Sequence, residues 1–172
     1  ITDGQIFLET DLFNSGVRPA VNPGISVSRV GSAAQIKAMK KVSGSLKLSY
    51  SQYRELQAFS QFGSDLDQDT KDRLAKGERI VEVLKQNRNA PMTVEHQVII
   101  IYAVVNNFLR AIPVKQISDF EQALCTYVDE TQPDIIRAIR DTGDLTKENQ
   151  AALDEVLRDF AAEYLQTHAQ AE

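Results

Sequence analysis

From Ser32 to the end of the chain, apolar residues recur every three or four positions, and this period constrains the fold more than any other feature. The clearest stripe consists of Leu46, Tyr50, Tyr53, Leu56 and Phe59. Such spacing places side chains on one face of a helix, where a neighbouring helix buries them. The sequence therefore predicts a mainly α-helical protein whose helices pack as a bundle.

Turn and capping residues divide this helical part into separate helices. The pair Ser43-Gly44 is expected to interrupt the first helix, and Gly63 to close a second helix as a C-cap. Thr93 occupies an N-cap position, and Thr142-Gly143 should stop a short helix. Residues 169–172 are expected to fray at the end of the last helix.

One segment, residues 98–105, is ambiguous because it is rich in β-branched residues. Its sequence, VIIIYAVV, has the composition of a buried strand. It lies, however, inside an apolar stretch at 94–109 that is longer than an average strand. We therefore predict a helix that is apolar nearly all round and lies at the centre of the bundle.

Two strand-like segments precede the helices. The first runs from Gln5 to Glu9, and the second from Ile25 to Val30, after the turn signal Asn22-Pro23-Gly24. The second is expected to be a buried strand. Because two strands cannot bury both faces, we expect a larger sheet whose remaining strands are missing or are replaced by intermolecular contacts. Together with the lack of an initial methionine, this predicts a truncated chain.

Arg29 lies among small residues at the rim of the second predicted strand. Arginine carries a permanent charge and a planar fork of donors that suits phosphate oxygens. The hydroxyls of Ser26 and Ser28 are expected to orient that fork. Taken alone, however, an arginine at a strand end is more often half of a surface ion pair, and both interpretations remain open at this point.

Composition excludes several classes of function. The 172 residues are 42% hydrophobic and 25% charged, which is typical of soluble globular proteins. A net charge of −5 without a basic cluster argues against nucleic acid as the main partner. No apolar run approaches the ~18 residues of a membrane span. The single cysteine, Cys125, is expected to be a buried thiol rather than a disulfide partner.

Common catalytic and metal-binding patterns are absent from the sequence. None of the eight glycines belongs to a phosphate-binding loop of the G-x-x-x-x-G-K-[ST] type. His96 and His168 are isolated, so we expect exposed or capping roles for both. The cluster Asp65, Asp67 and Asp69 lacks the glycine and the final glutamate of a calcium loop. We therefore predict no metal site.

Several motifs resemble the alpha subunit of the F-type ATP synthase. They are ITDGQIFLE at 1–9, GVRPAVN at 16–22 and PGISVSRVGSAAQ at 23–35, followed by QYREL, FGSDLD, LKQ and APM. The resemblance covers essentially the whole chain. It implies that residues 1–32 are the truncated end of an α/β nucleotide-binding domain, contributing its last short strands, and that residues 33–172 form an α-helical C-terminal domain.

The resemblance also implies roles for individual residues. Arg29 matches an arginine finger that reaches the catalytic site of the neighbouring beta subunit, and Ser26 matches a serine required for activity. Arg18, Pro19 and Gln86 match residues around the adenine of a second, non-hydrolysed nucleotide. Arg88 stands where the family has glutamine, although an arginine plane can still stack on a base. 

A segment near residue 62 resembles the part of the helical domain that faces the rotating gamma shaft. Its residues are Phe62, Ser64, Asp65 and Asp67. The implied assembly alternates alpha with beta subunits in a hexamer and includes the gamma shaft and stator subunits. It uses ATP or ADP with magnesium and a proton gradient, and is peripheral to an energy-transducing membrane. The cytoplasmic face of a bacterial inner membrane is the expected location, with mitochondrial and chloroplast equivalents as alternatives.

Two other interpretations remain open at this level. The chain could be a freestanding helical interaction module, or a subunit of another hexameric nucleotide motor such as a helicase, for which basic loops would be expected. The isolated chain is expected to bind no cofactor and to hydrolyse no ATP. The sequence upstream of Ile1 would distinguish these interpretations.

Overall fold

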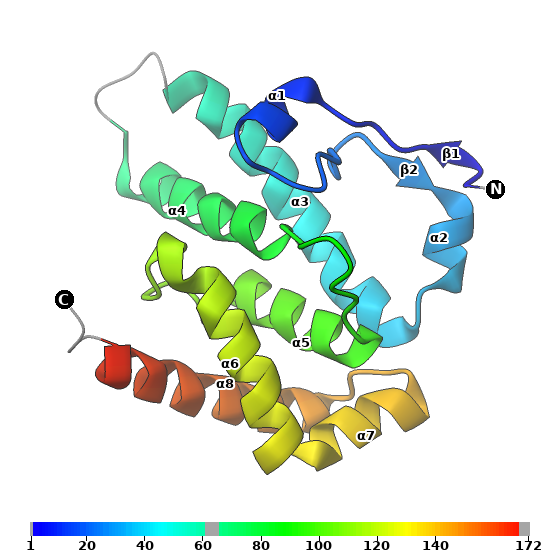
Figure 1. Cartoon of the computed structure of the whole chain (residues 1–172), viewed down its shortest axis with the longest axis vertical. Helices are drawn as coiled ribbons and strands as arrows, with labels where there is room; N and C mark the ends of the chain where they lie inside the picture. Colours follow the sequence, from blue (N-terminus) through cyan, green and yellow to red (C-terminus); the bar gives the residue numbers. More distant parts are fainter. Residues whose placement is uncertain (1, 61–65, 169–172) are drawn as a thin grey trace.

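A computed structural model describes residues 2–60 and 66–168 of the chain (Figure 1). Its elements, in chain order, are β1 (Gly4–Gln5), α1 (Thr10–Asn14), β2 (Val27–Ser28), α2 (Arg29–Ala34), α3 (Lys37–Ser60), α4 (Gln68–Val83), α5 (Val94–Val105), the 3-10 helix η1 (Val114–Gln116), α6 (Ile117–Thr131), α7 (Pro133–Thr142) and α8 (Lys147–His168). The predicted mainly α-helical fold with two short strands is confirmed.

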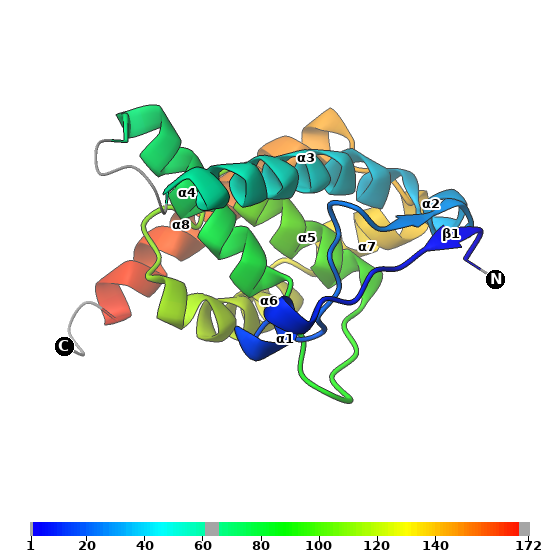
Figure 2. The ribbon, with the colours of Figure 1, turned by 90° about the horizontal axis from the view of Figure 1, so that it is seen from above.

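Helix α5 is the central helix of the bundle. It packs against α3, α4 and α7, and both ribbon views show it between these neighbours (Figures 1 and 2). Its sides are buried almost all round, which confirms that the β-branched run at 98–105 is helical. The hydroxyl of Thr93 accepts a hydrogen bond from the His96 N–H at 3.3 Å, so the predicted N-cap is also confirmed.

The predicted break at Ser43-Gly44 is wrong, because α3 continues through both residues. A glycine inside a helix costs about 1 kcal/mol relative to alanine. On either side of Gly44, Ala38, Val42 and Leu46 bury their side chains in the core. The packing of this face outweighs the local preference of one glycine.

The remaining helices pack over an aromatic cluster. Phe120 of α6 lies 5.3 Å from Phe160 and 5.1 Å from Tyr164 of α8, measured between ring centroids. Gly143 ends α7 with a left-handed φ of 63°, and its N–H donates to the Ile139 carbonyl at 2.9 Å. The predicted stop at Thr142-Gly143 is thus confirmed. Gly63 and residues 169–172 lie outside the described residues.

The N-terminal segment, residues 2–35, follows one side of the bundle as a thin layer (Figure 2). Its two strands pair antiparallel, with Gly4 opposite Ser28 and Gln5 opposite Val27. A further isolated bridge joins Leu8 and Val21. The first predicted strand is therefore reduced to a two-residue strand and a bridge.

The second predicted strand is wrong in both extent and burial. It ends at Ser28, whose hydroxyl accepts the Gly31 N–H at 2.9 Å and so starts α2 at Arg29. Ile25, Val27 and Val30 are each about half exposed. Within the described residues the sheet has only these two strands, so no further strand covers these side chains and they remain half exposed.

Candidate functional site

A hollow of about 660 Å³ opens where the loop after α1 meets the loop after α4. We call it the Arg18 hollow. It is lined by Leu8, Glu9, Thr10, Phe13, Arg18, Pro19, Ala20, Gln86, Asn87 and Arg88. The structure therefore brings together all four residues that the resemblance assigned to nucleotide binding, although two of them lie near residue 18 and two near residue 87.

Direct contacts hold the two loops of the Arg18 hollow together. The Gln86 N–H donates to the Arg18 carbonyl at 2.9 Å, and the Gln86 side-chain amide donates to the Ala90 carbonyl at 2.9 Å. The Arg18-Pro19 peptide bond is cis. The Arg18 guanidinium carbon lies 4.2 Å from the centroid of the Phe13 ring, a cation–π arrangement that fixes both planar groups.

The lining has the composition of a site for a flat, partly polar molecule. Leu8 and Phe13 are 73% and 50% exposed, so apolar surface is available in the hollow. Glu9, Gln86 and Arg88 add hydrogen-bonding groups to the same lining. Pockets that combine apolar surface with a few polar groups bind small organic ligands, and the planar guanidinium of arginine stacks well on rings.

Arg29 is the first residue of α2, and its side chain is 80% exposed. One terminal nitrogen lies 3.8 Å from a carboxylate oxygen of Asp3. An ion pair this exposed is worth less than about 1 kcal/mol. Arg29 thus forms the surface ion pair that was one of its two interpretations from the sequence. Because the contact with Asp3 is long and exposed, the guanidinium remains accessible.

The expectation that Ser26 and Ser28 orient the Arg29 fork is wrong. The Ser26 hydroxyl donates to the Asn22 carbonyl at 2.6 Å and accepts the Phe7 N–H at 3.0 Å. The Ser28 hydroxyl donates to the Thr2 carbonyl at 2.9 Å and caps α2. Both hydroxyls therefore fix the backbone that carries Arg29 rather than its side chain.

The residues assigned to the rotor-facing tip lie mostly beyond the described ranges. Phe62, Ser64 and Asp65 all fall within residues 61–65. Asp67 is described, and its carboxylate accepts the Thr70 N–H at 2.7 Å as the N-cap of α4. This hydrogen bond to the charged form lowers the pKa of Asp67.

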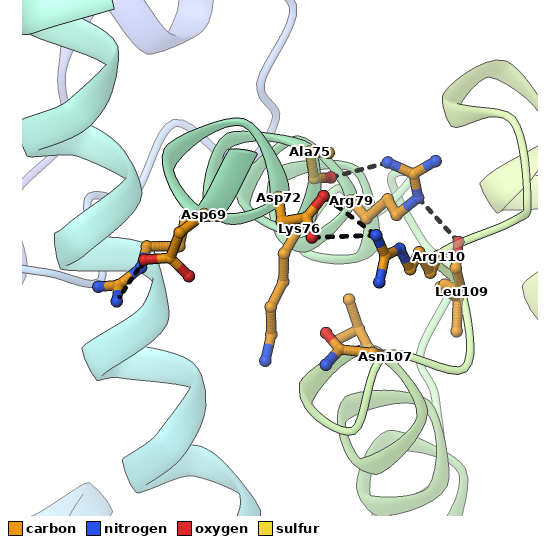
Figure 3. A pocket seen from close by; sticks show the side chains of 10 residues that line it. Asp69, Asp72, Ala75, Lys76, Arg79, Asn107, Leu109 and Arg110 are labelled. Atoms are coloured by element: carbon orange, nitrogen blue, oxygen red, sulfur yellow. Dashed lines mark hydrogen bonds and ion pairs between the residues drawn. The ribbon is translucent and has the colours of Figure 1, made fainter. Parts of the chain in front are cut away.

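A second hollow, of about 320 Å³, lies between α4 and the turns that follow α5 (Figure 3). Lys76 donates to the Val105 carbonyl at 2.6 Å. Arg79 donates to the carbonyls of Leu109, at 2.8 Å, and Ile112, at 3.0 Å. These side chains satisfy carbonyls at and beyond the C-terminus of α5, where the helix itself offers no donors.

The other two cations of this second hollow also have partners. Arg110 pairs with Asp72 and Arg73 with Asp69, each at 2.9 Å (Figure 3). All four cations lining the hollow are thus engaged inside the described chain. We interpret it as a junction that fastens the turns after α5 to α4, and not as an open anion site.

Other chemically active side chains are scattered. His96 Nε2 lies 2.9 Å from an Asp129 carboxylate oxygen, within hydrogen-bonding distance, and the His96 N–H donates to the Thr93 hydroxyl. Burial raises the pKa of the partly buried Cys125 thiol to about 11, which keeps it protonated and unreactive at neutral pH. Within residues 2–60 and 66–168, no three His, Cys, Asp or Glu side chains are grouped as a metal site requires.

Sequence reasoning missed two residues at the Arg18 hollow. Phe13 was not singled out, although an exposed aromatic residue beside an Arg-Pro pair is a usable signal. Glu9 gave no signal, because its contact with Asn22 joins positions thirteen residues apart.

Among the described helices, none has the length and hydropathy needed to cross a membrane.

Comparison with known proteins gives a consistent result. Residues 35–160 match the family described as ATP synthase alpha/beta chain, C terminal domain. The chain is 55% identical to ATP synthase subunit alpha of Acetivibrio thermocellus over 97% of its length. It is 57% identical, over 93%, to the sodium ion specific subunit alpha of Acetobacterium woodii, and 58% identical, over 96%, to subunit alpha of Clostridium botulinum strain Eklund 17B. It spans about a third of these relatives, which are covered over 33%, 32% and 33% of their lengths.

Proposed function

This chain belongs to the ATP synthase alpha/beta family as the C-terminal part of an alpha subunit, and we propose that it supports ATP synthesis from ADP and phosphate driven by a proton gradient. In this proposal residues 1–32 close a nucleotide-binding domain and residues 33–172 form the helical domain. We propose the proton as the coupling ion. One relative is named for the sodium ion instead, so the choice is tested by comparing synthesis under the two gradients.

The proposed assembly sets the partners of the chain. Alpha and beta subunits alternate in a hexamer around the gamma shaft, with stator subunits outside, and the chain meets the membrane only through this assembly. ATP and ADP bind with magnesium in the complete complex. The sequence contains no phosphate-binding loop motif, so the isolated chain should hydrolyse no ATP.

The observation that carries the proposal is the Arg18 hollow. Arg18, Pro19, Gln86 and Arg88 come from two distant segments and line one hollow that also offers apolar surface from Phe13. A nucleobase is flat, apolar on its faces and polar at its edges, so it matches this lining. We assign the hollow to the base of the non-hydrolysed nucleotide, with the Arg88 guanidinium stacking in place of a glutamine contact.

Arg29 carries the proposed catalytic role. Its guanidinium is accessible and permanently charged, and among the described residues its one ion pair is the long contact with Asp3. Charge builds on the phosphoryl oxygens during transfer, and an arginine supplied by a neighbouring subunit stabilises it, with rate effects of roughly 10³ to 10⁵ in GTPases. Ser26 would support this role by fixing the backbone before Arg29.

Equilibrium nucleotide binding to the purified complex tests the assignment of the Arg18 hollow to the nucleotide base. Gln86→Ala should weaken binding at the non-catalytic sites about five- to tenfold, the effect of losing a hydrogen bond worth about 1 kcal/mol. Arg88→Gln should change the same affinity with little effect on maximal turnover. Arg158→Gln is the matched control, because Arg158 is exposed on α8 and does not line the hollow. Unchanged affinity in both hollow variants would remove the hollow from the nucleotide site.

A further inference from the structure

Asn22 occupies a buried position between the two candidate sites. It keeps 8% of its surface exposed, which is unusual because asparagine is mostly exposed in proteins. On one side it faces Glu9, which lines the Arg18 hollow. On the other side the chain runs through Gly24 and Ser26 to Arg29. A buried amide in this place needs a partner for each of its polar groups.

The first set of contacts leads from Asn22 to the hollow. Its side-chain amide donates to a carboxylate oxygen of Glu9 at 2.7 Å, and its N–H donates to the Phe7 carbonyl at 2.9 Å. Glu9 is itself held, because its N–H donates to the Ala20 carbonyl at 2.9 Å. Its other carboxylate oxygen lies 3.6 Å from Arg54 of α3. Glu9 thus joins Asn22 and the lining of the hollow to the bundle.

The second set of contacts leads from Asn22 toward Arg29. Its side-chain oxygen accepts the Gly24 N–H at 2.9 Å. Its carbonyl accepts both the Ser26 N–H, at 3.1 Å, and the Ser26 hydroxyl, at 2.6 Å. These bonds shape the loop that leads into the Ser28 cap, from which Arg29 begins α2.

We propose that Asn22 is a positioning residue that holds the lining of the Arg18 hollow and the segment carrying Arg29 in one fixed arrangement. This inference rests on the proposed function of both sites. An amide is required because it donates to Glu9 and accepts from Gly24 at the same time, whereas an aspartate at neutral pH only accepts. A purely local turn would need the Gly24 bond alone. The hydrogen bond to Glu9 reaches outside the turn and connects the turn to the lining of the hollow.

A donor swap in the assembled complex tests this assignment. Asn22→Asp places a second carboxylate against Glu9, and the two groups then repel each other without a proton between them. Glu9→Gln in the same chain restores the bond with its direction reversed, because the glutamine amide donates to the new aspartate. The complex is made with Asn22→Asp, with Glu9→Gln and with both changes. Nucleotide affinity at the non-catalytic sites, turnover and the melting temperature are measured for each.

Asn22→Asp should lower both affinity and turnover about tenfold, as for a lost buried hydrogen bond beside a like charge. The double variant should return both to within about threefold of the Glu9→Gln complex, which is its reference because Glu9 lines the hollow. Wild-type behaviour of Asn22→Asp would overturn the inference. So would a double variant that regains only its melting temperature, since that is the signature of a purely structural contact.

Arg29→Lys and Gln86→Ala complexes, measured in parallel, separate this inference from its premise. If both behave as wild type, the proposed function fails and the inference falls with it. If both lose function as expected while the donor swap restores nothing, the two sites stand and only the role of Asn22 is overturned.

Discussion

The helical bundle and the N-terminal segment are stabilised in different ways. In the bundle, large apolar side chains such as Phe120, Leu124 and Leu157 are buried completely or nearly so. In the segment, Leu12 is buried, while Phe7, Leu8 and Val27 remain exposed. The segment is held instead by hydrogen bonds, many of which converge on Asn22 and Ser26.

The residues that set stability and the residues of the candidate sites therefore lie largely in different parts of the chain. Hydrophobic burial sets the stability of a domain, and the bundle contains most of it. Arg18 and Arg29 both lie in the segment, and the bundle adds the loop with Gln86 and Arg88. We therefore expect substitutions in the bundle to change unfolding, and substitutions in the segment to change binding and turnover.

The largest effect on stability should come from the aromatic cluster. Phe120 is fully buried against Phe160 and Tyr164, so Phe120→Ala should lower the free energy of unfolding by about 3 to 5 kcal/mol. Val27→Ala is the matched change in the segment, where the side chain is 51% exposed, and should cost less than about 0.5 kcal/mol. Urea denaturation of the 172-residue chain measures both. Similar losses for the two variants would contradict a core confined to the bundle.

Two helical glycines of the bundle should respond in opposite ways to replacement by alanine. A Cβ on Gly77 of α4 would overlap the ring of the buried Tyr53, so Gly77→Ala should cost about 1 to 3 kcal/mol. A Cβ on Gly44 of α3 would meet no atom within 4 Å, so Gly44→Ala should gain up to about 1 kcal/mol from helix propensity. Thermal melts followed by circular dichroism test the opposite signs. A stabilising Gly77→Ala would contradict the packing described for α3 and α4.

A smaller effect should appear as a pH dependence at the α4 and α6 contact. Burial, and secondly the charge of Glu82, raises the pKa of Glu121 from 4.5 to about 8. Between these values the unfolded chain loses the proton that the folded chain keeps, so the stability falls as the pH rises. Glu121→Gln removes this loss, so its stability advantage over wild type should grow steadily from pH 5 to pH 8.

Unfolding curves at several pH values measure this difference. Glu82→Gln should reduce the pH dependence, because it removes the second cause of the raised pKa. Parallel stability profiles for wild type and Glu121→Gln would show that the Glu121 carboxyl is not held in its neutral form.

The helices could be predicted from the sequence because their apolar period is strong and local. The central helix at 98–105 required only the additional argument from length. Gly44 misled the prediction because the burial of one helix face, which depends on α5, outweighed a local preference. The strand at 25–30 was overextended because Ser28 acts as a helix cap, and a strand pattern does not reveal that role.

The candidate site was less accessible to sequence reasoning. Arg18 and Gln86 were placed together only through a family resemblance, since no local pattern links positions so far apart. The roles of Ser26 and Asn22 depend on tertiary hydrogen bonds to Phe7 and Glu9, which spacing cannot reveal. Such contacts become visible only when the fold is known.

The central claim is that the bundle sets stability while Arg29 in the N-terminal segment acts in catalysis. Its most direct test is multi-site ATP turnover by a purified complex carrying Arg29→Lys, compared with the nucleotide affinity and melting temperature of the same complex. Lysine keeps the charge but loses the planar fork and the reach of arginine. Turnover should fall by about 10³-fold or more, while nucleotide affinity and stability stay close to wild type. Near wild-type turnover would contradict it and would reduce Arg29 to the surface ion pair with Asp3.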